Sequence, residues 1–230
     1  SLVLELLMSQ EIYLFQEIVQ LNLYDHQHNH TLKKLMMQLM ARTEIIEIFK
    51  ETEALLEGHF VLTSGKHSPS YFQCAKLLQH PGYLSKFANL IAQNFHDTDI
   101  DAVISPAIGG IVLGTEVGRI LDVKTIFAER ENGEMCIRRG FEVHEGQNIL
   151  VIEDVITTGG SVQEVMNEVK KMGGVISGVG VLVDRSNGSV KLHQNQFSII
   201  ELQAVSYHPD NVPDSLKKIP VQKPGSRKIQ

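Results

Sequence analysis

Apolar runs of strand length alternate with helical stripes along most of this chain. Short, nearly continuous apolar runs predict buried strands at 101–104, 123–128, 148–152, 175–183 and 197–202. Apolar residues that recur every three or four positions predict helices between them, at 84–95, 111–121 and 162–169. Strands that alternate with helices indicate an α/β fold, with a central parallel sheet flanked by helices on both faces.

Residues 1–40 do not follow this alternation. Leucine and isoleucine recur there at loosely helical spacing on both sides of the polar stretch 25–30, which predicts two short helices around a loop. The histidines of that loop are interpreted as solvated, since no cysteine accompanies them. We expect a helical extension or a non-native leader here, followed by the domain proper at 41–210 and a polar tail at 211–230.

Two other segments carry turn signals. A helical stripe that includes Ile48, Phe49 and Leu55 is expected to stop at Gly58, and two short strands around a Ser-Gly turn are expected within 58–75. Farther along, the Asn-Gly pair at 132–133 predicts the tip of a hairpin-like loop.

Composition narrows the class of protein. A chain of 230 residues that is 43% apolar suits one large domain with its own core. The net charge of -6 argues against nucleic acid as the main partner, since phosphate backbones bind basic surfaces. Cys74 and Cys136 lie far apart without metal-type spacing, so we expect a cytoplasmic protein with neither a disulfide framework nor a zinc site. No window reaches membrane-spanning length, and no membrane partner is expected.

The strand at 148–152 leads into the most informative residues of the chain. Two adjacent carboxylates, Glu153 and Asp154, follow it, and a short loop then opens a helix. This loop is suited to a phosphate monoester, because its glycines let the backbone approach while hydroxyls and free N–H groups donate to oxygen. The residues expected to bind phosphate are Thr157, Thr158, Gly159, Gly160 and Ser161.

The two acids are suited to bind a different part of the same ligand from the part that the loop binds. Carboxylates repel a phosphate unless they face hydroxyl groups or a bound cation, so a sugar phosphate with free hydroxyls satisfies both halves of the motif. An ordinary capped helix start would explain the glycines and Ser161 but gives the acid pair no role. Neither Gly-x-x-x-x-Gly-Lys-Ser/Thr nor Gly-x-Gly-x-x-Gly joins a strand to a helix in this sequence.

Two further strand ends carry candidate ligand-binding residues. The strand at 101–104 leads into a second glycine turn, for which a plain strand-to-helix turn and an anion site are about equally favoured. Arg185 follows the strand at 175–183, on the edge of an open α/β sheet where ligands bind. The residues of the second turn are Ala107, Ile108, Gly109 and Gly110.

The run from Asn148 to Ser161 resembles the phosphoribosyl-diphosphate signature of the type I phosphoribosyltransferases. Within that family, the segment from Phe60 to Phe72 is similar to the orotate enzymes, whose N-terminal hood carries Phe-x-Leu-x-Ser-Gly-x-x-Ser-Pro-x-Tyr/Phe-Phe. The resemblance covers roughly 43–207. It implies a type I phosphoribosyltransferase-like fold with a small hood at 58–75.

The resemblance also implies an activity. Orotate phosphoribosyltransferases transfer ribose 5-phosphate from 5-phosphoribosyl 1-diphosphate (PRPP) to orotate, giving orotidine 5′-monophosphate and diphosphate in de novo pyrimidine biosynthesis. It implies Mg²⁺ as a cofactor, carried by the diphosphate and held directly or indirectly by Glu153 and Asp154, and a homodimer. Three alternatives stay open: a phosphoribosyltransferase for another base, a ligand-sensing regulator with the same fold, and a structural or interaction protein with an inactive site.

Residue roles follow from the resemblance where the motif matches. Glu153 and Asp154 are expected to act at the ribose and Arg130 at the diphosphate. The lysines and histidine that the family carries after Arg130 are missing, so Arg138 and Arg139 are inferred as replacements from the cations that a diphosphate requires. The expected substrate-binding residues are those of the two glycine turns, Arg185 at the orotate carboxylate, and the hood residues Thr63, Tyr71 and Phe72.

Overall fold

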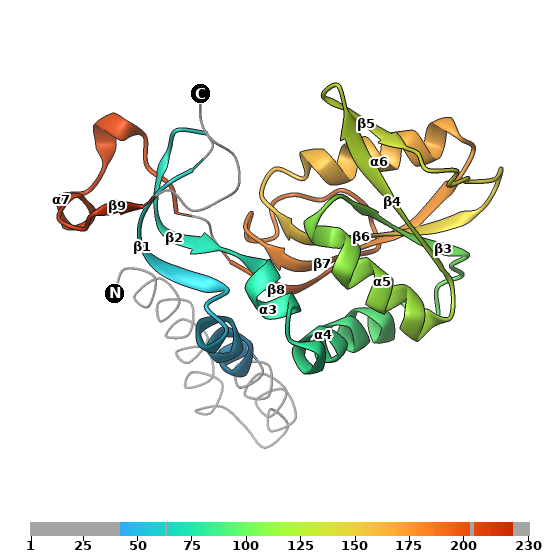
Figure 1. Cartoon of the computed structure of the whole chain (residues 1–230), viewed down its shortest axis with the longest axis horizontal. Helices are drawn as coiled ribbons and strands as arrows, with labels where there is room; N and C mark the ends of the chain where they lie inside the picture. Colours follow the sequence, from blue (N-terminus) through green and yellow to red (C-terminus); the bar gives the residue numbers. More distant parts are fainter. Residues whose placement is uncertain (1–41, 63, 203–204, 223–230) are drawn as a thin grey trace, which may run out of the picture. The chain divides into compact units, whose positions relative to one another are not determined.

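The computed structural model describes residues 42–62, 64–202 and 205–222, which fall into two compact units (Figure 1). The first unit comprises Ser1–Gln73 and Val205–Gln230, and the second comprises Cys74–Ala204. The two short helices predicted within 1–40 lie outside the described residues.

The second unit is built on a sheet whose described strands follow the order β5-β4-β3-β6-β7-β8. Neighbouring strands run parallel except β4 and β5, which form an antiparallel hairpin at one edge. The strands are β3 (Ala102–Pro106), β4 (Lys124–Glu131), β5 (Glu134–Ile137), β6 (Asn148–Ile156), β7 (Val175–Asp184) and β8 (Gln196–Glu201). The helices are α3 (Cys74–Leu78), α4 (Pro81–Asn94), α5 (Gly109–Leu121) and α6 (Gly160–Lys171). The predicted α/β fold with a mostly parallel sheet is confirmed.

Helices cover both faces of this sheet because its central strands are apolar on both sides. Val151 of β6 and Val165 of α6 belong to one buried cluster. Ile152 points to the opposite face, where a methyl group added at Gly180 of β7 would contact both Ile152 and Ile91 of α4. Each fully buried side chain of this kind contributes about 1.5–3 kcal/mol to folding. Figure 1 shows α6 on one side of the strands and α4 and α5 on the other.

The hairpin at the sheet edge has the turn that the sequence indicates. Asn132 and Gly133 have φ angles of 52° and 90°, the left-handed conformation that a two-residue hairpin turn requires. The predicted hairpin tip is therefore confirmed. None of the described helices combines the length and apolar character needed to cross a lipid bilayer.

The first unit contains a small sheet whose described strands follow the order β2-β1-β9. β1 pairs with β2 in antiparallel fashion and with β9 in parallel. The elements of this unit are a helix over 42–51, β1 (Leu55–Val61), β2 (His67–Phe72), η2 (Pro209–Asn211), α7 (Asp214–Lys217) and β9 (Val221–Gln222). The described part of the expected C-terminal tail thus includes α7 and a strand that pairs with β1. Whether 41–210 is the domain proper stays a prediction.

The helix over 42–51 is shorter than the apolar stripe indicated. The stripe extended to Leu55, whereas Leu55 begins β1, so this prediction was wrong at its end. The Thr52 hydroxyl donates to Ile48 O at 2.7 Å, and Glu53 adopts a left-handed φ of 55°. A left-handed residue ends a helix whatever apolar residues follow it.

Candidate active site

The loop between β6 and α6 forms the centre of the site. Gly159 has a left-handed φ of 73° and precedes α6, whose start carries no capping side-chain hydrogen bond within the described residues. The first N–H groups of α6 are therefore available to an anion, which the helix dipole also favours. A cavity of about 200 Å³ lies at this loop, lined by Glu153 and residues 155–162. All five residues predicted to bind phosphate fall within that lining.

The second glycine turn lies directly beside the acid pair. β3 runs parallel to β6, so both turns open at the carboxyl edge of the sheet. A methyl group added at Gly109 would overlap the Asp154 carboxyl group, and one added at Gly110 would lie 3.0 Å from Glu153 Oε1. Only glycine lets the carboxyl groups approach the backbone this closely. Ile108 is 82% exposed, and the peptide bond between Ala107 and Ile108 is cis.

The two acids occupy unequal environments. Burial raises the pKa of Glu153 well above its usual range, and the nearby Asp154 charge raises this pKa further. Glu153 Oε1 accepts a hydrogen bond from Asp154 N at 3.0 Å. Asp154 is only half-buried, and its Oδ1 accepts a hydrogen bond from Val155 N at 2.9 Å. The pair therefore combines a carboxyl group that favours its proton with a more accessible one.

Cys74, at the start of α3, is a neighbour of the site that sequence reasoning missed. Its thiol pKa is raised mainly by burial and further by the charges of Asp154 and Glu153, whereas the charge of Arg185 opposes the shift. These charge interactions place Cys74 close to both acids and to Arg185. A thiol that stays neutral is poorly suited to nucleophilic chemistry. No spacing in the sequence links this lone cysteine to the distant acids.

Arg185 follows β7 directly beside the phosphate-binding loop. Its N–H group donates to Ile156 O at 2.9 Å, and Ile156 pairs with Asp184 across β6 and β7. Because Thr157 is the next residue after Ile156, the loops that follow these two strands leave the sheet side by side. Arg185 therefore lies at the same edge as the acids, and its role stays a prediction.

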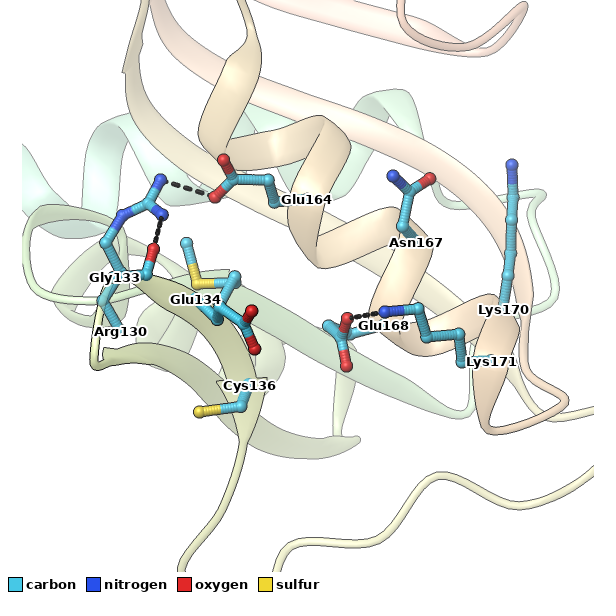
Figure 2. A pocket seen from close by; sticks show the side chains of 10 residues that line it. Arg130, Gly133, Glu134, Cys136, Glu164, Asn167, Glu168, Lys170 and Lys171 are labelled. Carbon is cyan, nitrogen blue, oxygen red and sulfur yellow. Dashed lines mark hydrogen bonds and ion pairs between the residues drawn. The ribbon is translucent and has the colours of Figure 1, made fainter.

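Arg130 of the β4–β5 hairpin is engaged by α6. It forms an ion pair with Glu164, and its Nη1 donates to Gly133 O at 2.8 Å (Figure 2). These residues, with Lys170 and Lys171, line a second cavity of about 840 Å³ between the hairpin and α6. In the described chain, this cavity shares no lining residue with the cavity at the phosphate-binding loop.

The other two hairpin arginines also contact carboxylates of this chain. Arg138 pairs with Glu131 at 2.7 Å. Arg139 donates two hydrogen bonds to Glu129, at 2.8 and 2.9 Å, and its guanidinium lies 5.6 Å from the centre of the Phe127 ring. The structure does not bring these arginines to the phosphate-binding loop. A role of Arg138 and Arg139 at the diphosphate stays a prediction.

The predicted hood residues belong to the first unit. Thr63 lies outside the described residues. The ring of Tyr71 lies 5.9 Å from that of Phe60, and the ring of Phe72 lies edge-on to that of Phe49 at 6.0 Å. Both contacts are packing within the unit, and a role in substrate binding stays a prediction.

The acid pair suits Mg²⁺ only as an ion shared with a substrate. Within the described ranges, no group of three or more His, Cys, Asp or Glu side chains is placed to hold a metal ion. Glu153 and Asp154 offer two carboxyl groups, and Mg²⁺ bound through phosphates needs no more than one or two. The residues therefore fit an ion carried by a diphosphate.

Comparison with known proteins identifies the relatives of this chain. The phosphoribosyl transferase domain matches residues 73–212. The chain is 57% identical over 188 residues to the orotate phosphoribosyltransferase of Chlorobaculum parvum, covering 82% of this chain and 97% of that one. It is 53% identical over 190 residues to the orotate phosphoribosyltransferase of Pelotomaculum thermopropionicum, covering 83% of this chain and all (100%) of that one. The solved orotate phosphoribosyltransferase of Aeropyrum pernix shares the fold, with a TM-score of 0.59 and 24% identity over 68% of this chain and 92% of that chain.

Proposed function

The chain belongs to the orotate phosphoribosyltransferase family, and on that premise we propose that this site transfers the 5-phosphoribosyl group from PRPP to orotate. The products are orotidine 5′-monophosphate and diphosphate, so the reaction belongs to pyrimidine biosynthesis. The observation that carries the residue assignment is the acid pair, which lies between two glycine turns at one sheet edge.

Each part of PRPP has a partner at this edge. The 5′-phosphate binds the loop 157–161, where open N–H groups and hydroxyls donate to its oxygens. The ribose hydroxyls face Glu153 and Asp154. The diphosphate is assigned to the turn 107–110, which lies close enough to the Asp154 carboxyl group for the two to share a bound cation.

The reaction needs no protein nucleophile. The bond from C1 of the ribose to the diphosphate oxygen breaks, and its electron pair leaves with the diphosphate. Orotate N1 forms the new bond to C1, and its proton passes to solvent. Positive charge builds on the ribose during this exchange, and the Asp154 carboxylate stabilises it without having to reorient.

Mg²⁺ is the proposed cofactor. When bound with the diphosphate, it neutralises part of the charge that the leaving group gains. Asp154, and Glu153 once it loses its proton, are the side chains that would hold the ion or orient its water ligands. A bound cation would oppose the rise in the pKa of Glu153, because a nearby positive charge favours the charged form of the carboxyl group.

Recognition of the base is assigned to Arg185 in this proposal. The orotate carboxylate presents two oxygens that match the parallel N–H groups of a guanidinium. Uracil lacks this carboxylate and offers the guanidinium no such pair of oxygens.

We also propose a cytoplasmic homodimer, which is supported by the family resemblance. Light scattering at micromolar concentration should give twice the 25.7 kDa of one chain. A mass of one chain under assay conditions would contradict the dimer without affecting the proposed reaction.

The decisive experiment for the reaction follows orotate by its ultraviolet absorbance. Absorbance should fall when the protein, orotate, PRPP and Mg²⁺ are all present, and chromatography should detect orotidine 5′-monophosphate. Omitting PRPP should abolish the loss, and EDTA should suppress it. Persistent orotate in the complete mixture would contradict the proposed function.

A further inference from the structure

Asp184, the last residue of β7, holds the loop 185–192 that follows it. Its side chain is fully buried at the carboxyl edge of the sheet. Oδ1 accepts a hydrogen bond from Ser186 N at 2.7 Å, and Oδ2 accepts one from Gly188 N at 3.2 Å. A carboxyl group removed from water needs such donors, and donors from the backbone fix the turn that carries them. Arg185 lies inside this turn, so moving its backbone would break these bonds.

The loop is tied to a strand on each side of β7. At its start, Arg185 N donates to Ile156 O of β6 at 2.9 Å. At its far end, Gln196 of β8 accepts a hydrogen bond from Leu192 N at 2.9 Å and donates one to Val190 O at 3.0 Å. These bonds leave the loop little freedom relative to the sheet edge.

The far end of the loop packs onto the phosphate-binding loop. A methyl group added at Gly159 would lie 2.8 Å from Leu192 Cδ2 and 3.0 Å from Val190 Cγ1, closer than carbon atoms tolerate. One short segment therefore begins with Arg185 and ends against the residue that precedes α6. The hydrogen bonds within the loop 185–192 therefore set the distance between Arg185 and Gly159.

We infer that Asp184 is a positioning residue for orotate recognition, because its bonds to the loop backbone hold Arg185 at a fixed distance from the phosphate-binding loop. The inference rests on the proposed function, in which Arg185 binds the orotate carboxylate and residues 157–161 bind the 5′-phosphate. These two groups belong to different ends of the product nucleotide. A loop that fixes Arg185 relative to the phosphate-binding loop favours a base whose carboxylate reaches Arg185 while the 5′-phosphate is bound.

Asp184→Asn tests this role with little change in volume. The amide keeps one acceptor oxygen, but its NH₂ group faces the second backbone N–H, so one loop bond is lost. We expect the ratio of kcat/KM for orotate to that for uracil to fall at least tenfold. The uracil value should change less than threefold, because uracil does not use Arg185. A site that is damaged in general would slow both bases equally and leave the ratio unchanged.

Asp101→Asn is the matched control. Asp101 Oδ2 also accepts a backbone hydrogen bond, from Asn148 N at 2.7 Å, but at the amino end of β6. The orotate-to-uracil ratio should stay within twofold of the wild-type value in this variant. If Asp184→Asn does not fold, Asp184→Glu provides the test, since the longer side chain moves both acceptor oxygens away from Ser186 N and Gly188 N. A ratio lowered threefold or more supports the inference, and an unchanged ratio overturns it.

The double variant Asp184→Asn/Arg185→Ala shows whether Asp184 acts through Arg185. If it does, Asp184→Asn should lower the ratio less than twofold further once Arg185 is gone, and fully multiplicative effects would overturn the inference. Failure of the proposed function looks different, because the wild-type protein would then not consume orotate. Orotate turnover with an unchanged ratio in Asp184→Asn would overturn the role of Asp184 alone.

Discussion

Asp154 is the carboxyl group best placed to stabilise charge on the ribose, because it is less buried than Glu153 and lies against the Gly109 turn. Asp154→Asn should keep the fold but lower kcat on the order of 100-fold, with a much smaller change in KM for PRPP, because this stabilisation develops in the transition state. Steady-state kinetics and a thermal melt measure both effects. Asp122→Asn, an exposed change at the left-handed residue after α5, is the control. Unchanged turnover in Asp154→Asn would remove this residue from the mechanism.

Arg185 is the residue proposed to distinguish orotate from other bases. Arg185→Ala should cost orotate about 2–5 kcal/mol in transition-state binding, the usual penalty for truncating one member of a buried charge pair. The kcat/KM for uracil should barely change. Arg119→Ala, which removes a 64% exposed arginine from α5, controls for the loss of a positive charge. Equal losses for both bases would mean that Arg185 does not bind the orotate carboxylate.

Sequence reasoning succeeded at residues that are neighbours in the chain. Glu153 and residues 157–161 lie within one strand–loop–helix segment, so local spacing was enough to place them at one cavity, while their roles in binding stay predictions. Cys74 and Asp184 were missed as parts of the site, because their environments depend on which strands and helices pack together. No residue type or spacing near Cys74 indicates that it lies beside Asp154.

At the scale of elements, the hairpin is held on α6 by the pair between Arg130 and Glu164. Their side chains are 38% and 43% exposed, so the pair is worth only about 0.2–1 kcal/mol. If Arg130 must leave Glu164 to reach the diphosphate, Glu164→Gln should lower KM for PRPP by a factor of up to about 5. Glu168→Gln, one turn later on α6, removes only a pair with Lys171 and should leave KM unchanged. Equal KM values in the two variants would show that this pair does not compete with substrate.

The contact between α4 and α5 predicts a pH dependence of stability. Hydrogen bonds from Arg119, and then from Ser85 of α4, lower the pKa of Glu116 to about 2. A lowered folded-state pKa stabilises the fold above the ordinary carboxyl range, and this contribution is lost as pH falls toward 2. Glu116→Gln should therefore cost about 1 kcal/mol at pH 7, a modest value because Arg119 is largely exposed.

Urea unfolding from pH 7 to pH 3 measures this effect. The difference in free energy of unfolding between the wild type and Glu116→Gln should shrink steadily below about pH 4.5, because the wild-type carboxylate takes up its proton there. Glu47→Gln, in an exposed position of the helix over 42–51, controls for the loss of a carboxylate. If this difference in free energy of unfolding stays constant with pH, the charge of Glu116 is not its cause.

For the whole molecule, apolar periodicity was sufficient to predict the alternation of strands and helices. It did not predict that a strand near the C-terminal end pairs with β1. Parallel strands buried on both faces have nearly continuous apolar runs, which single them out in the sequence. The strand β9 has only two residues, Val221 and Gln222, and pairs with His59 and Phe60 of β1. Such a short strand carries no period of its own, so its pairing depends on tertiary contacts that the sequence pattern does not encode.

Binding of PRPP should stabilise the whole protein, because a ligand that binds only the folded state shifts unfolding by mass action. At 100 times its Kd, a ligand adds about 2.7 kcal/mol to the free energy of unfolding, which for a chain of this size raises Tm by about 5–10 °C.

Thr158→Ala/Ser161→Ala removes two proposed hydroxyl donors while leaving the N–H groups of α6 in place. Its Tm without ligand should match the wild type within about 2 °C, since neither side chain caps the helix. At the same PRPP concentration, its shift should be less than half as large, and EDTA should reduce the wild-type shift. Equal shifts in both proteins would show that these two hydroxyls do not contribute to binding of the 5′-phosphate.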